Sequence, residues 1–423
     1  MRRPLPCAPF LLEPKVQGAS SMSPATPSPS LPRPGQARRA RGALAVVASY
    51  TAAIACTALL FLAWRVHVYH ATFASREFFW LGDVHVHDDA IGFKMRPGRR
   101  GLAVLNHGIL DPARRIPVRT DPLGFRVPLD RDSTVVQAGG IAAIGCSCTF
   151  AHGVAAESSY VNLAGELLGV PAYNLGVCGY SAVTSLLLLE ENLGRLRPRF
   201  VVYGFGNFHL ERSGRPRSDG ILFQASAACD ARGCRIEPPR FSNGRSFGLV
   251  PRIEALYYEP KLAGRPTPLD LQRVRAVMPL AIQDLGRALN PRYLSLRSAT
   301  HALPETTFCR FLVGRLHDDC RRSGARCVVL WFPASFGERP LPGLLAAVEE
   351  LHGAEDFTFV DCSPRLFAGV RDAAEYGARW QVPRDGHPNR FMHLEMARVL
   401  ADALGPRVGG PANSTASPGN RRE

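Results

Sequence analysis

Lysine is nearly absent from this chain, and its scarcity changes how the charge is interpreted. Only three of the 51 basic residues are lysines (Lys15, Lys94 and Lys261), and the arginines are spread along the whole length. No zinc finger, helix-turn-helix or aromatic-basic RNA-binding signature accompanies the formal charge of +15. We therefore attribute the charge to a general preference for arginine and expect no nucleic-acid partner.

The chain also lacks a C-x-x-C pair, the commonest element of structural zinc sites. Eleven cysteines are present nonetheless. Cys229 and Cys234 lie close together in the polar segment CDARGC, where a disulfide could form outside the cytoplasm, although sequence alone does not fix the pairing. Cys146 and Cys148 are more simply explained as small buried residues than as metal ligands. We expect no metal and no cofactor.

Charge is missing from one long stretch near the N-terminus. Residues 43–64 are 22 consecutive uncharged and mostly apolar positions, bracketed by Arg41 and Arg65. As a helix they would extend roughly 33 Å at about 1.5 Å per residue, which matches the hydrocarbon core of a bilayer. Trp64 suits the membrane interface. The sequence therefore predicts a transmembrane helix over residues 42–65.

The flanks of this stretch indicate its orientation. A cleaved signal peptide is the alternative, but the run is long, starts far from Met1 and lacks a small-x-small cleavage site. Only Arg65 and Arg76 follow it closely, whereas seven basic residues precede it: Arg2, Arg3, Lys15, Arg33, Arg38, Arg39 and Arg41. By the positive-inside rule, the N-terminus is cytoplasmic and the rest of the chain is periplasmic or extracellular.

Composition divides the chain into regions, and no internal repeat is visible. Residues 1–41 and 405–423 are rich in Pro, Ser, Gly and Arg and are predicted to be disordered, the first as a cytoplasmic tail. Residues 66–135 carry turn signals without a helical period and predict an extended lead-in with short strands. Residues 136–404 form the main domain, and within it residues 208–306 look like a long insertion that could form a lid.

The main domain alternates short apolar runs with helical patterns. The runs predict strands at 141–144, 172–175, 200–205, 327–332 and 357–360. The helical patterns lie at 157–168, 182–196, 307–322, 341–351 and 390–404. Strands alternating with helices predict an α/β fold whose parallel sheet is covered on both faces.

Four short polar or glycine-rich blocks stand out: three lie at the ends of predicted strands, and the fourth comes just before the last helix. They read GCSCTFAHG at 145–153, NLGVCGYS at 174–181, GFGN at 204–207 and DGHPN at 385–389. Taken alone, Ser147 is better explained as a helix N-cap, and a serine hydroxyl needs an adjacent base to act as a nucleophile. Because ligands bind beyond the carboxyl ends of parallel strands, however, the four blocks are expected to converge at one edge of the sheet.

With these four blocks the chain resembles the SGNH (GDSL-like) hydrolase family. That family is defined by Ser, Gly, Asn and His blocks in this chain order, and the resemblance covers residues 141–210 and 380–404, roughly a quarter of the chain. It implies a flavodoxin-like three-layer α/β/α sandwich, preceded here by one transmembrane helix. It also implies a serine-dependent reaction without a cofactor.

The resemblance assigns a role to each matched residue. Ser147 would be the nucleophile, His387 its base and Asp385 the group that orients the imidazole. The oxyanion would be held by the backbone N–H groups of Ser147 and Gly179 and by the Asn207 amide. Two departures stand out, since cysteine replaces the family's Asp before the serine and the spacing from Asp to His is two residues instead of three. Either Asp385 reaches His387 from a tighter turn, or another group orients the ring.

Two functions follow from this interpretation. The first is an ester hydrolase or O-acyl transferase that acts through an acyl-enzyme on an ester-bearing glycan, lipid or small molecule. The second is a catalytically inactive SGNH-like module that binds glycans or assists assembly at the membrane. Three weaker candidates remain. His85 and His87 could bind a metal ion, although a third ligand is not evident, and His152 and His209 could contact the substrate. Arg212 could bind a substrate anion, but a solvated arginine is the safer interpretation.

Overall fold

The computed structural model describes residues 34–75, 78–105, 115–130, 137–218, 222–239, 244–262, 265–289 and 302–408. Most of the two predicted disordered tails lies outside the described residues, although residues 34–41 and 405–408 are helical. The chain divides into two compact units, Met1–Leu59 and Leu60–Glu423. Each unit is described by itself.

The first unit contains most of α1 (Pro34–Ser75). Apolar side chains such as Leu44 and Ile54 are exposed on this helix. Its hydroxyl groups donate to carbonyl oxygens four residues earlier, at 2.8–2.9 Å for Ser49, Thr51 and Thr57. Polar groups are thus satisfied within the helix, as a membrane span requires. Among the described residues, Arg41–Ser75 is the one helix that is long and apolar enough to cross a membrane, by length and composition.

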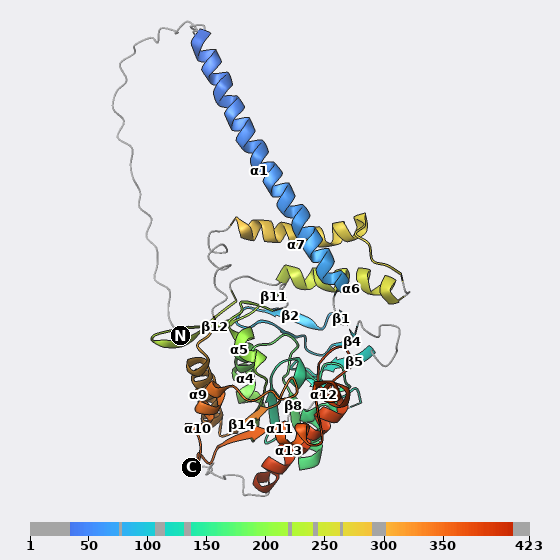
Figure 1. Ribbon diagram of the computed structural model, residues 1–423, viewed down its shortest axis with the longest axis vertical. Coiled ribbons are helices and arrows are strands. Elements are labelled where there is room, and N and C mark those ends of the chain that lie inside the picture. Colours follow the sequence, from blue (N-terminus) through green and yellow to red (C-terminus); the bar gives the residue numbers. More distant parts are fainter. Residues whose placement is uncertain are drawn as a thin grey trace, which may run out of the picture. The chain divides into compact units, whose positions relative to one another are not determined.

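The second unit is built on a nine-stranded mixed sheet, whose parallel half carries the predicted α/β pattern (Figure 1). The parallel strands lie in the order β8-β7-β9-β14-β15, which is 2-1-3-4-5 along the chain. Their bounds are Ala172–Asn174 (β8), Ile141–Ile144 (β7), Phe200–Phe205 (β9), Arg326–Trp331 (β14) and Phe357–Asp361 (β15). Every residue of β7 and β9 is buried. Two of these strands match their predicted bounds, and the other three differ by one residue at one or both ends.

Two groups of helices contact this sheet. In the first, α3 (Tyr160–Leu168) packs closely on α13 (Arg390–Val408). In the second, α9 (Glu305–Ser323) packs on α4 (Ala182–Leu196) and α10 (Pro342–Glu349). All five were predicted, with ends that shift by a few residues at most. Two shorter helices, α11 (Ser363–Phe367) and α12 (Ala373–Trp380), were not predicted.

The predicted lead-in joins the same sheet. Its strands are antiparallel and lie in the order β1-β4-β5-β6, with bounds Phe78–Leu81, Arg100–Leu105, Arg115–Thr120 and Arg126–Val127. Strand β6 pairs with β8 through Arg126 and Asn174. A separate hairpin consists of β2 (His85–Asp88) and β3 (Gly92–Met95). The sheet predicted to be parallel is therefore mixed, because the short strands of residues 66–135 extend it at one side.

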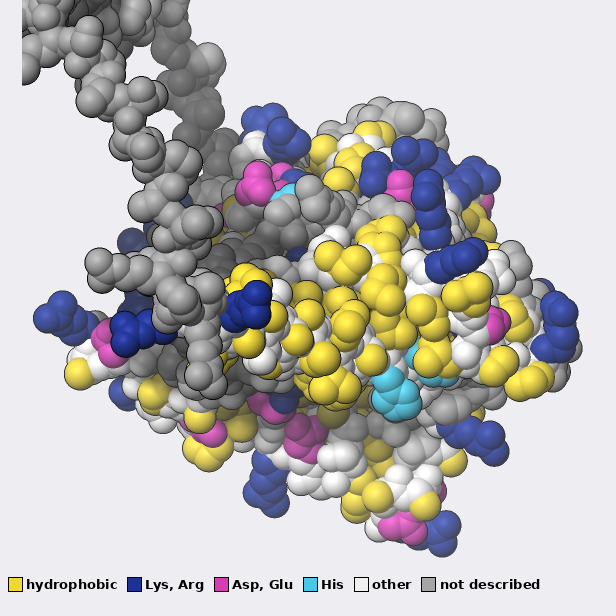
Figure 2. Space-filling view, turned by 90° about the horizontal axis from the view of Figure 1, so that it is seen from above, with side chains coloured by type: hydrophobic (Ala, Val, Ile, Leu, Met, Phe, Trp, Pro, Cys, Tyr) yellow, Lys and Arg dark blue, Asp and Glu magenta, His cyan; other side chains and the backbone are white. Residues whose placement is uncertain are grey.

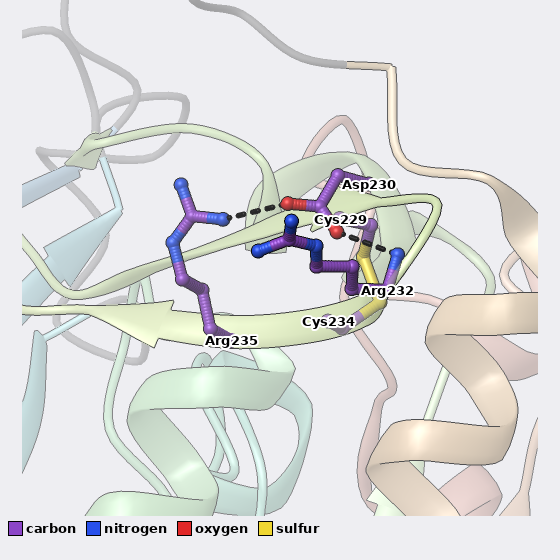
Figure 3. The surroundings of a disulfide bond; sticks show 5 residues. All are labelled: Cys229, Asp230, Arg232, Cys234 and Arg235. Carbon is purple, nitrogen blue, oxygen red and sulfur yellow. Dashed lines mark hydrogen bonds and ion pairs between the residues drawn. A yellow bond between two sulfur atoms is a disulfide. The ribbon is translucent and has the colours of Figure 1, made fainter.

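The predicted insertion contains secondary structure that its sequence pattern does not show. It begins with α5 (Phe208–Ser213) and the hairpin strands β10 (Arg217–Ser218) and β11 (Leu222–Phe223). Next come β12 (Ser226–Asp230) and β13 (Gly233–Glu237), which pair antiparallel. Cys229 and Cys234 face each other across this second hairpin and form a disulfide (Figure 3).

Helices α6 (Gly244–Leu262) and α7 (Leu271–Ala288) complete the insertion and pack against residues of α1 that belong to the second unit. The buried carboxylate of Asp284 in α7 accepts a hydrogen bond from the hydroxyl of Tyr69 at 2.9 Å. It also forms ion pairs with three arginines: Arg65, Arg217 and Arg287.

Figure 2 shows a face on which hydrophobic side chains gather, with Lys and Arg side chains around them.

A buried arginine joins the lead-in strands to the turn after β7. Arg126 is 1% exposed. Its guanidinium donates to the carbonyl oxygens of Phe150, Ala151 and Val154, at 2.6 Å for Ala151 and 2.7 Å for Val154. It also lies 4.4 Å from the centre of the Phe150 ring. Burial lowers the pKa of Arg126 to about 10, so the group still carries its charge at neutral pH.

We expect Arg126→Met to lower the free energy of unfolding by about 2–4 kcal/mol, because several buried carbonyl groups would lose their donor. The measurement is guanidinium-induced unfolding of the detergent-solubilised chain. Arg100→Met is the matched control, since Arg100 is an exposed strand residue and its loss should change stability by less than about 0.5 kcal/mol. Equal effects of the two substitutions would contradict this role of Arg126.

Candidate functional site

Ser147 lies where β7 ends, at the carboxyl edge of the parallel strands. The chain turns through Gly145 and Cys146 and enters the short helix α2 (Ser147–Phe150). Gly145 has φ +154°, and a Cβ added there would lie 2.2 Å from the Thr149 hydroxyl, so only glycine fits this turn. The helix N-cap is Cys146 and makes no side-chain cap bond. Ser147 is therefore not the cap that its residue type alone would suggest.

The fourth block places an imidazole beside this serine. His387 Nε2 lies 2.8 Å from Ser147 Oγ, and these two residues are 240 positions apart in the chain. The His387 carbonyl accepts a bond from the Val382 N–H at 2.8 Å, and Gln381 pairs with Pro388 as an isolated β-bridge. These contacts form a narrow turn immediately before α13.

Asp385 lies on the other side of the same imidazole. Its Oδ2 atom is 3.0 Å from His387 Nδ1, and its side chain is 3% exposed. The Asp385 N–H donates to the Val382 carbonyl at 3.1 Å, which tightens the turn. The spacing of two residues is therefore bridged by a tighter turn, the first of the two possibilities left open by the sequence.

A second histidine adjoins this arrangement. The His152 ring lies 4.6 Å from the His387 ring between centroids, and its Nε2 atom is 4.0 Å from Asp385 Oδ2. Its Nδ1 atom is 3.8 Å from the sulfur of Cys178. Burial, and to a smaller extent the positive charge of His387 when it is protonated, lowers the pKa of His152 to about 3. His152 is therefore neutral at ordinary pH, whereas the more exposed His387 faces the serine.

Ligand atoms of His152, Asp385 and His387 all lie within 4.8 Å of one another, so these residues could hold a metal ion. Nδ1 and Nε2 of His387 already contact Asp385 and Ser147. A metal would therefore displace one of those contacts.

The other metal candidate from the sequence involves His87 in β2. Its Nε2 atom lies 2.8 Å from Asp89 Oδ1, and its Nδ1 atom lies 3.0 Å from the Gly92 carbonyl oxygen.

The three predicted oxyanion donors, Ser147, Gly179 and Asn207, differ in the hydrogen bonds that they already make. The N–H of Ser147 is at the first position of α2, where no acceptor exists within the helix. Gly179 has φ +82°, and its carbonyl accepts a bond from Ser218. The Asn207 amide donates to the Arg339 carbonyl at 2.8 Å, and its oxygen accepts from the Trp331 indole at 3.0 Å. Neither Gly179 nor Asn207 lines the pocket described next.

A pocket of about 190 Å³ opens at the serine. Its wall is largely apolar, and its polar members besides the serine, histidine and aspartate are Arg212 and Gln381. The full lining is Ser147, Cys148, Phe208, Arg212, Phe332, Pro333, Ala334, Gln381, Asp385, Gly386, His387, Pro388 and Met392. The segment after β14 was missed in the sequence, although its place at the end of a parallel strand is a signal that could have found it.

Two histidines considered as substrate contacts do not line this pocket. His152 is buried behind His387, as described above. His209 is buried too, and its Nδ1 atom accepts a bond from the Gly206 N–H at 3.2 Å. The beginning of the insertion does reach the pocket, through Phe208 and Arg212, whereas α6 and α7 contribute no lining residue.

Comparisons with known proteins add little to this geometry. No family model matches the chain, and no curated protein matches it. Among solved structures it is similar to a protein from Desulfitobacterium hafniense DCB-2 that is assigned as a lipolytic protein of the G-D-S-L family. The identity is 11% and the TM-score 0.30, over 63% of this chain and 99% of that one. A likeness at this level does not define an activity.

The neutral state of buried His152 predicts a pH dependence of stability. Its pKa is about 3 in the folded chain and about 6.5 when unfolded. Between these values only the unfolded state binds the proton, so stability falls as pH decreases from about 6.5, by up to about 1.4 kcal/mol per pH unit for this histidine. We expect His152→Asn to make the slope shallower by that amount, measured as the free energy of unfolding between pH 7 and pH 4.

His352 provides the matched control for this measurement because it is exposed. His352→Asn should leave the slope as it is in the unmodified chain. An unchanged slope in His152→Asn, with the control also unchanged, would mean that His152 takes up its proton in the folded chain.

Proposed function

We propose that this chain is a membrane-anchored serine ester hydrolase or O-acyl transferase of the SGNH type. The observation that carries the proposal is the row of three side chains in which Ser147 Oγ lies 2.8 Å from His387 Nε2 and His387 Nδ1 lies 3.0 Å from Asp385 Oδ2. A serine hydroxyl becomes a nucleophile when a base within hydrogen-bond reach can accept its proton and a carboxylate orients that base.

The reaction proceeds in two halves. His387 accepts the proton of Ser147 as the hydroxyl oxygen attacks the ester carbonyl, and it returns that proton to the leaving alcohol. Asp385 holds the imidazole through Nδ1 and stabilises its charged form. Water or an acceptor hydroxyl then attacks the acyl-enzyme, again with His387 as the base, and the choice between them separates hydrolysis from transfer.

The proposed donors to the developing oxyanion are the N–H groups of Ser147 and Gly179 and the Asn207 amide, of which only Ser147 lines the pocket. Each such donor lowers the barrier by about 3–4 kcal/mol in comparable sites. The amide of Asn207 already bonds to the Arg339 carbonyl. It therefore serves through its second N–H, or it turns away from Arg339 when the substrate binds.

The proposed SGNH assignment draws on sequence and fold together. The Ser, Gly, Asn and His blocks occur in the family's chain order. The five parallel strands have the order 2-1-3-4-5, which is that of flavodoxin-like sheets. We assign residues 136–404 to this three-layer α/β/α domain, with the strands of residues 66–135 as an extension of its sheet.

The proposed location is outside the cytoplasm, with α1 as the anchor. The uncharged stretch of α1 and the excess of basic residues before it support a cytoplasmic N-terminus. The disulfide between Cys229 and Cys234 is typical of an oxidising compartment. An ester on a glycan, lipid or small molecule at the membrane is the proposed substrate.

We expect the full-length chain to react with a fluorophosphonate probe at Ser147 and to lose that reaction in Ser147→Ala and His387→Ala, because the hydroxyl is then absent or has no base. The readout is probe fluorescence on the purified chain. Asp385→Asn should react but more slowly, since the base would be held less well. Turnover of a reactive ester should fall by about 10²–10⁴-fold in that variant.

The exposed serine Ser335 provides the control, and Ser335→Ala should be labelled like the unmodified chain. Each variant's folding is checked by its cooperative unfolding. A correctly folded chain that is never labelled and cleaves no ester would refute the enzymatic proposal and favour a binding module.

The anchor is tested separately. With Ile54→Arg and Leu59→Arg together, the chain should leave the carbonate-washed membrane pellet, because each arginine at the centre of a span costs about 2.5–3.5 kcal/mol on insertion scales. The measurement is the fraction of the chain in that pellet after expression in a bacterium. Leu345→Arg, at an exposed leucine of α10, should not change it, and retention of the doubly charged chain would exclude α1 as the anchor.

A further inference from the structure

Arg212 is a cation in the pocket wall for which the proposed chemistry has no use. It lies in α5 and lines the same pocket as Ser147 and His387. Its Nη1 atom is buried and has no hydrogen-bond partner. Within the described part of the chain, Arg212 forms no ion pair. A buried guanidinium N–H without an acceptor is unfavourable, so this atom is suited to a ligand oxygen.

The neighbours of Arg212 give it an aromatic contact but no free acid. Its guanidinium carbon lies 4.7 Å from the centre of the Phe208 ring, a cation–π contact that supplies no hydrogen-bond acceptor. The N–H groups lie at the edge, where carboxylate and phosphate oxygens bind. Nearby acids are engaged elsewhere, since Glu211 pairs with Arg215 and Asp385 contacts His387.

The charge of Arg212 also acts close to the proposed nucleophile. A hydrogen bond with Cys146 and burial raise the pKa of the Cys148 thiol, and the positive charge of Arg212 opposes this rise. Cys148 follows Ser147 directly and lines the same pocket. A charge that acts on this residue also acts on a substrate bound at the serine, and the apolar wall screens it weakly.

We propose that Arg212 is the subsite for a negatively charged oxygen group, carboxylate or phosphate, on the ester substrate. This inference rests on the proposed serine ester chemistry and specifies its substrate class. The pocket of about 190 Å³ is small, so the charged group lies within a few bonds of the ester and not on a distant part of a large molecule. The chain is thus selective for compact anionic esters over neutral esters of the same size.

The test compares esters that differ only in charge. The purified full-length chain is assayed with 4-acetoxybenzoate, 4-acetoxyphenyl phosphate and neutral 4-acetoxybenzamide, and each rate is corrected for the ester's own reactivity in buffer. A second pair, the 4-nitrophenyl half-ester of glutarate and 4-nitrophenyl pentanoate, places the charge on the acyl side. We expect kcat/KM to favour the anionic member of at least one pair by tenfold or more, and the preferred probe shows which anion and which side are recognised.

Arg212→Gln should bring that ratio close to one, and Arg212→Lys should restore part of it, because a charge without the planar fork still attracts the anion. Arg195→Gln is the matched control, since Arg195 lies in the last turn of α4, is exposed and does not line the pocket. It should keep the full ratio. An unmodified chain without charge preference, or an Arg212→Gln chain that retains it, would overturn the inference.

A binding measurement separates this inference from the catalytic proposal. In a Ser147→Ala background, calorimetry should show that the anionic member of at least one of these probe pairs binds at least tenfold more tightly than its neutral member and that adding Arg212→Gln removes the difference. If no ester is cleaved but this difference is present, the enzymatic proposal fails and the anion subsite stands. If esters are cleaved but neither kcat/KM nor binding depends on charge, the subsite fails and the enzymatic proposal stands.

Discussion

Arg126 holds the turn that carries Ser147, and the geometry of the site depends on that support. Its guanidinium satisfies the carbonyl groups of Phe150, the last residue of α2, and of Ala151 and Val154, which follow α2. The Asn174 amide adds a bond to the Thr149 carbonyl at 2.8 Å, from the neighbouring strand. Buried carbonyl groups need donors; here they come from β6 and β8, which pair with each other. The lead-in strands are therefore a structural part of the site.

Two histidine rings, those of His387 and His152, lie next to the carboxylate of Asp385, but their environments differ. Asp385 is 3.0 Å from His387 and 4.0 Å from His152. Burial lowers the pKa of His152 to about 3, which keeps this ring neutral next to the carboxylate. His387 is the more exposed ring and the one that reaches the serine. Different environments thus separate two residues of the same type, so that only one of them is suited to carry a proton to and from a substrate.

The insertion combines two roles at its two ends. Its first helix contributes Phe208 and Arg212 to the pocket. Its last helix, α7, contains Asp284, which pairs with Arg65 of α1. A charge buried among apolar side chains is tolerated only when it is paired; this requirement fixes α7 against the last turns of α1. Part of the pocket wall and the attachment to the end of the proposed anchor thus belong to one segment of the chain.

Local patterns in the sequence determined the apolar stretch of α1, five parallel strands, five of their helices and the chain order of the four polar blocks. Periodicity and strand ends are short-range properties, so they can be read without the fold. They did not reveal α6 and α7, because Pro251, Pro260 and Pro279 interrupt the helical pattern. Nor could they show that Asp385 reaches His387, that Arg126 supports the serine turn or that Arg212 faces the pocket. The contact of Asp385 with His387 depends on how tightly the turn before α13 closes, and the other two features bring together residues from separate elements. Only the packing of the whole domain decides which of these side chains meet.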